Sequence, residues 1–75
     1  MSVSDVIYGA SWGTSYEVLT YDSESDEMRV KSSHTTLRES QRAARRLARA
    51  LGVPCRQSGR HPEMWTPKLR RWVPC

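Results

Sequence analysis

A chain of 75 residues has room for one domain with a small core, because such a chain buries only about 60 to 65% of its unfolded surface. Apolar residues make up 37% of the chain, and no apolar run is long enough to span a membrane. The N-terminal region lacks the basic-then-apolar order of a signal peptide. We therefore expect a cytoplasmic protein with no membrane partner.

The net charge of +4 divides unevenly along the chain. Residues 1–37 carry six acidic and two basic side chains, which gives −4, and residues 38–75 carry ten basic and two acidic side chains, which gives +8. Either the two halves neutralise each other in the fold, or each half faces a partner of opposite sign. Nucleic acid is one partner that suits the basic half.

Residues 6–12 have the composition of a strand. Within them, Gly9 marks either a bulge or a close approach of another backbone segment. Residues 13–15 read as a turn. The chain should therefore reverse direction after its first strand.

A second strand at 16–21 and a third at 28–32 are predicted to form a hairpin through the polar connection at 22–27. The second strand is apolar on both faces and needs cover on both sides. The third alternates, with Met28 and Val30 expected to point inward.

Residues 37–51 predict an amphipathic helix. Thr36 and Glu39 form a capping box at its start, and Gly52 followed by Val53 and Pro54 ends it. At about 100° per residue, one side of the helix is apolar or small and should be buried. Its members are Leu37, Ser40, Ala44, Leu47, Ala48 and Leu51.

The opposite side of this helix gathers arginines. Arg38, Arg42, Arg45 and Arg49 fall within about 60° of one another, with Arg46 just beyond. Glu39 is the one carboxylate in the helix, so most of this charge has no intrahelical partner. One interpretation is a ridge whose ligand is a phosphate, RNA or the acidic surface of another protein. The other is a solvated face in an arginine-rich chain.

The tail at 53–75 contains four prolines, which disfavour a long helix, although residues 69–73 could add an edge strand. We expect Trp65 and Trp72, with Met64 and Leu69, to cover the second face of the sheet. The predicted fold class is therefore α+β. It consists of a three-stranded antiparallel sheet with one helix on one face and an irregular, tryptophan-containing tail.

The tail also interleaves aromatic and basic side chains: Trp65, Lys68, Arg70, Arg71 and Trp72. Single-stranded nucleic acids favour such a mixture, since bases stack on indoles while cations meet phosphates. The competing interpretation places both tryptophans in the core. Arg70 and Arg71 extend the helical ridge only if the tail runs beside it.

Asp22, Glu24 and Asp26 alternate as in a calcium loop, but Glu27 and Ser33 occupy the positions of its glycine and its bidentate glutamate. We therefore expect no calcium site. Such an acidic turn is either solvated or mimics the charge of a nucleic acid.

Cys55, Cys75, His34 and His61 lack the short spacings of a zinc site, and a cytoplasmic location disfavours a disulfide. The chain shows no phosphate loop or paired-carboxylate cleft. We expect no metal, no cofactor and no enzymatic activity.

The order of elements over residues 6–52, with a helix that starts at Thr36 and closes at Leu51 and Gly52, resembles the small arm-binding modules of phage integrases. Those modules read the major groove with the sheet face, which here carries Glu17 beside Arg29 and Lys31. In size the chain also resembles small phage and mobile-element inhibitors such as anti-CRISPR proteins.

Two functions are therefore expected to compete. The first is a binding protein that docks on nucleic acid or a nucleoprotein machine through the arginine face, supported by Arg70 and Arg71. The second is a phage or mobile-element inhibitor or adaptor that blocks one host protein complex by steric occupation or nucleic-acid mimicry.

Overall fold

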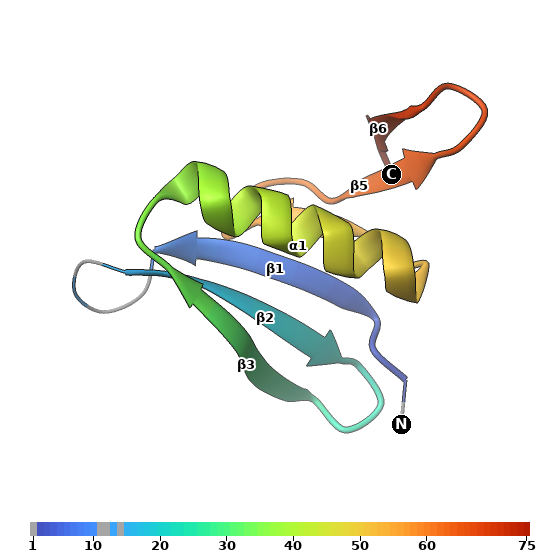
Figure 1. Cartoon of the computed structure of the whole chain (residues 1–75). Helices are drawn as coiled ribbons and strands as arrows, with labels where there is room; N and C mark the ends of the chain where they lie inside the picture. Colours follow the sequence, from blue (N-terminus) through green and yellow to red (C-terminus); the bar gives the residue numbers. More distant parts are fainter. Residues whose placement is uncertain (1, 11–12, 14) are drawn as a thin grey trace.

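The first three strands form an antiparallel meander. A computed structural model describes residues 2–10, 13 and 15–75, and it shows β1 (Asp5–Ala10), β2 (Tyr16–Asp22) and β3 (Glu27–His34) side by side (Figure 1). Ser11 and Trp12 of the strand expected at 6–12, and Thr14 of the expected turn, lie outside the described residues.

The helix α1 (Leu37–Leu51) begins and ends at the residues that its caps predict. The hydroxyl of Thr36 accepts a hydrogen bond from the backbone N–H of Glu39 at 3.1 Å. The Glu39 carboxylate accepts from the hydroxyl of Thr35 at 3.3 Å rather than from the cap amide. Gly52 takes a left-handed conformation with φ of 70°, and its N–H points to the last carbonyls of the helix.

The expectation of a three-stranded antiparallel sheet with an irregular tail is wrong. The tail forms β4 (Cys55–Gln57), β5 (Glu63–Thr66) and β6 (Arg71–Pro74). The sheet has six strands in the order β3-β2-β1-β4-β5-β6. It is mixed, because β4 lies parallel to β1 while the other neighbours are antiparallel.

The crossover through α1 explains the parallel pair. The helix carries the chain back along the sheet after β3, so β4 starts at the same end as β1 and pairs with it. The carbonyl of Pro54 accepts a hydrogen bond from the N–H of Val6 at 2.9 Å, which extends this pairing.

The four prolines of the tail do not prevent strands, because each lies at a strand end or in a turn. Pro54 precedes β4, Pro62 precedes β5, Pro67 follows β5 and Pro74 ends β6. At these positions the missing backbone N–H costs little. The edge strand considered at 69–73 lies slightly later, at Arg71–Pro74.

The core lies between α1 and the sheet. It is formed by Val6, Tyr8, Val18, Ala44, Ala48 and Cys55. Small residues of the helix make this contact, and Ser40 is buried with its hydroxyl donating to the Leu37 carbonyl at 2.7 Å. Leu37 and Leu51, expected in the buried stripe, are 37% and 45% exposed because they are the end residues of the helix.

The other face of the sheet is less covered than predicted. Met28 and Val30, expected to point inward, are 54% and 53% exposed on the edge strand β3. The tryptophans do not cover this face. Register pairs Glu63 with Cys55, whose side chain lies in the core, so alternation along β5 places Trp65 on the helix side too. No helix among the described residues is long and apolar enough to cross a membrane.

Candidate functional site

An open groove runs between α1 and the β5–β6 hairpin, which rises beside the helix in Figure 1. Its volume is about 460 Å³. The helix wall consists of the five predicted arginines and Gln41, and Trp72 of β6 forms the opposite wall: Arg38, Gln41, Arg42, Arg45, Arg46, Arg49 and Trp72. We call this site the basic groove. The helix face predicted as a free ridge is therefore one side of a two-walled site.

Arg45 is the most constrained arginine of the basic groove. Its guanidinium donates to both carboxylate oxygens of Glu63, at 3.3 and 3.4 Å, and its central carbon lies 5.4 Å from the ring centroid of Trp72. The side chain is only 33% exposed. Its charge is thus balanced inside the protein, and the guanidinium is held against an aromatic ring.

Arg49, one turn later, is held differently. Its guanidinium carbon lies 4.1 Å from the ring centroid of Trp65. Trp65 in turn meets Trp72 edge to face, with centroids 5.8 Å apart and planes at 62°. Among the described residues no carboxylate pairs with Arg49, so the ring orients a guanidinium whose charge stays available.

Arg38, Arg42 and Arg46 complete the helix wall and are exposed. Within the described part of the chain, no carboxylate lies within 4.0 Å of their guanidinium nitrogens. The β2–β3 hairpin, which we call the acidic hairpin for the carboxylates of residues 22–27, does not reach them, since its ion pair joins Glu27 to Arg29 at 3.4 Å. Like charges gathered without counter-charges create a positive potential that attracts anions.

Arg70 and Arg71 do not line the basic groove. Arg70 adopts a positive φ of 53° in the β5–β6 turn, and Arg71 opens β6 opposite Thr66. Since side chains alternate along a strand, Arg71 points to the face opposite Trp72. The structure therefore separates these two predicted binding residues from the other five.

Trp72 belongs both to the core and to the basic groove, whereas Trp65 lines neither and lies against Arg49. Trp72 packs against the buried cluster, and both indoles are half-buried. Two residues of the site were not predicted: Gln41, which lines the basic groove, and Glu63, which pairs with Arg45. Gln41 has the helical spacing that places it beside Arg38 and Arg45, so its position on the arginine face could have been predicted from the sequence. Glu63 is 18 residues from Arg45 in sequence, and no local pattern points to the pair.

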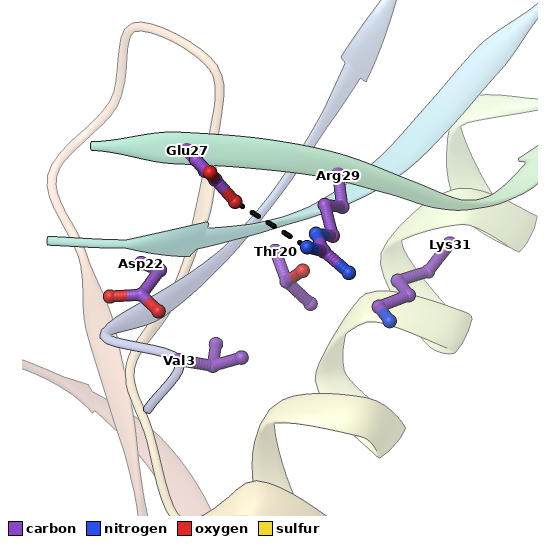
Figure 2. A pocket seen from close by; sticks show the side chains of 6 residues that line it. All are labelled: Val3, Thr20, Asp22, Glu27, Arg29 and Lys31. Atoms are coloured by element: carbon purple, nitrogen blue, oxygen red, sulfur yellow. Dashed lines mark hydrogen bonds and ion pairs between the residues drawn. The ribbon is translucent and has the colours of Figure 1, made fainter. Parts of the chain in front are cut away.

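The acidic hairpin carries a second, smaller pocket of about 120 Å³. Figure 2 shows the carboxylates of Asp22 and Glu27 and the cations of Arg29 and Lys31 around it. In the adjoining turn, Asp22 accepts from the N–H of Glu24 at 2.9 Å. The mixed charges of this pocket largely balance one another, so it has no marked preference for cations or anions.

The two cysteines are free and differ in environment. Cys55 is buried, and burial raises the pKa of its thiol from 9.0 to about 12, while Cys75 is exposed. In the described part of the chain, no three side chains among His, Cys, Asp and Glu come together as metal ligands.

Comparisons with models of protein families, with curated proteins and with solved structures found no match to this chain.

Proposed function

We propose that this protein is a non-enzymatic binding protein that docks on nucleic acid through the basic groove. The observation that supports the proposal is the presence of four arginines without a carboxylate partner among the described residues on one helix: Arg38, Arg42, Arg46 and Arg49. They neutralise phosphates and release condensed counterions, which gives favourable binding free energy at low salt.

The salt dependence of binding tests this proposal directly. If each of the four arginines neutralises one phosphate, log affinity falls with log salt at a slope of about −2.8 for a single strand and about −3.6 for a duplex. Fluorescence anisotropy with labelled oligonucleotides over a range of NaCl concentrations measures this slope. Binding that is independent of salt contradicts the proposal.

A charge-reversal variant locates the interface. We expect Arg38→Glu/Arg42→Glu/Arg46→Glu to abolish binding and leave the fold intact, because these side chains are exposed. The matched control is Lys68→Glu/Arg70→Glu/Arg71→Glu, which changes the net charge equally but lies outside the basic groove. Equal loss in both variants contradicts a localised interface.

A second candidate function remains for the acidic hairpin. Glu24 and Asp26 are exposed in its turn, and within the described residues neither forms an ion pair. Such a tip suits the mimicry of nucleic acid by an inhibitor or adaptor that blocks one host protein complex. Affinity capture from host lysate separates the two functions. Nuclease treatment should release partners bound through nucleic acid and should retain a protein complex bound through the hairpin.

A further inference from the structure

We infer that the basic groove takes a single-stranded nucleic acid, with its backbone along α1 and one base stacked on the Arg45–Trp72 pair. This inference rests on the proposed function and specifies its ligand class. Two features support it: the five arginines differ in whether they pair with a carboxylate, and the groove has a shape that suits an unpaired strand.

The arginines of the basic groove differ in whether a carboxylate compensates their charge. Four arginines of the groove have no ion pair among the described residues, whereas the Arg45 charge is balanced by Glu63 at 3.3 Å. A phosphate gains less from a guanidinium that already has a carboxylate partner, since that charge is largely compensated. Arg45 is therefore a poor phosphate ligand, although it lies in the middle of the helix wall.

The guanidinium of Arg45 offers a planar surface that is already fixed in place. The guanidinium of Arg45 is planar, is held by Glu63 on one side and lies over the Trp72 ring. Unstacked bases bind to planar guanidinium groups as well as to aromatic rings. Because Arg45 is held in place before the ligand arrives, stacking on it requires little further loss of side-chain entropy.

The open groove favours a single strand over a duplex. Trp72 is the residue of the β5–β6 hairpin that borders the helix arginines, so a ligand that contacts both the arginines and this ring must enter an open groove of about 460 Å³. The bases of a duplex are already stacked on each other and do not reach this ring. A duplex therefore contacts only the outer arginines, whereas a single strand presents both phosphates and free bases.

The test compares probes of equal charge. Labelled oligo(dT) and oligo(U) are titrated beside an abasic deoxyribose-phosphate strand of the same length and a duplex of half that length, which carries about the same number of phosphates, all at one salt concentration. We expect the two base-containing strands to bind about 5- to 140-fold more tightly than the abasic strand, the equivalent of one stacked base. The inference is supported whether oligo(dT) or oligo(U) binds more tightly, as long as both bind more tightly than the abasic strand. Equal affinity for the abasic strand, or tighter binding of the duplex, overturns it and leaves the proposed function standing. If none of the probes binds, the proposed function itself fails.

A conservative variant assigns the stacking surface. Arg45→Lys keeps the positive charge facing Glu63 but removes the planar group, so we expect the affinity ratio of oligo(dT) to the abasic strand to fall toward one. Arg42→Lys is the matched control, because Arg42 makes no cation–π contact among the described residues, and its ratio should not change. Thermal denaturation verifies that both variants fold. A ratio that stays unchanged in Arg45→Lys, or that falls equally in both variants, contradicts stacking at Arg45.

Discussion

Arg45 and Arg49 lie one helical turn apart but have different effects on the fold. Arg45 bridges α1 to β5 through Glu63 and lies near the Trp72 ring, and its side chain is largely buried, so replacing it with Glu would place two carboxylates together at a half-buried site. Arg49 lies over the ring of Trp65 and forms no ion pair among the described residues. Binding variants that leave Arg45 intact therefore report on the interface with less disturbance of stability.

Cys55 and Cys75 should differ in reactivity, because the thiolate is the reactive form and burial raises the pKa of Cys55 to about 12. At about pH 8 we expect Cys75 alone to react rapidly with a thiol reagent such as DTNB, and Cys55 to react only after unfolding in concentrated guanidinium chloride. Rapid reaction of both thiols in the native protein contradicts the burial of Cys55.

The same pKa predicts a loss of stability at high pH. The unfolded chain releases the Cys55 proton near the ordinary value of 9.0, whereas the folded chain holds it until about 12. Since the unfolded state binds fewer protons in this interval, the free energy of unfolding falls as pH rises through it. Urea denaturation of the wild type and of Cys55→Ala across this interval measures the effect, which should be smaller in the variant.

At the scale of elements, the parallel contact between β1 and β4 joins the meander to the tail. The backbone of β1 comes close to the chain after β4: the N–H of Ser58 donates to the Tyr8 carbonyl at 2.7 Å. A Cβ at Gly9 would lie 3.0 Å from the Cβ of Ser58. Of the two roles that the sequence suggests for Gly9, close approach of another segment is the one that the structure supports.

We therefore expect Gly9→Val to lower the free energy of unfolding by about 1 to 3 kcal/mol, because the added methyl groups overlap Ser58. The expectation runs against strand propensity, which favours Val over Gly. Combining Gly9→Val with Ser58→Gly should restore part of the loss. Chemical denaturation of the two single variants and the double variant measures this coupling. Additive effects contradict the close contact.

At the scale of the whole molecule, the β5–β6 hairpin is weakly joined to the rest of the sheet. β5 pairs with β4 only at Cys55 and Glu63, while β1 pairs along its full length with β2. Side chains supply the other links, through the Arg45–Glu63 ion pair and the packing of Trp72 on the core. One wall of the basic groove is thus the least anchored part of the sheet.

We expect hydrogen exchange to be faster for the β5 and β6 amides than for those of β1 and β2, because local opening requires fewer contacts to break. Exchange followed by mass spectrometry or NMR measures the difference. Addition of oligo(dT) should slow exchange in β5 and β6 if the ligand contacts both walls of the groove. Uniform protection across all strands of the free protein would show that the hairpin opens only with the whole fold.

The division of charge along the chain persists in three dimensions. Of the ion pairs among the described residues, one joins the acidic half to the basic half, from Arg56 to Asp5 at 3.2 Å. The others join Glu27 to Arg29 and Arg45 to Glu63, within one half each. The acidic hairpin and the basic groove therefore remain separate surfaces, each available to a partner of opposite charge.

The sequence by itself determined the helix, its caps and the gathering of arginines along one side of it. These features depend on residues a few positions apart, such as Thr36 and Glu39 or the arginines at helical spacing, and local geometry decides them. The sequence also predicted the hairpin of β2 and β3, because its residue composition and polar turn are local signals.

Only the tertiary structure decided the strands of the tail and the second wall of the groove. β4 has three residues and no β-branched side chain, and it becomes a strand because the crossover through α1 delivers it beside β1. The contacts of Glu63 and Trp72 with Arg45 follow from that placement. Pairing between segments distant in sequence is set by chain topology and core packing, so no local pattern contained it.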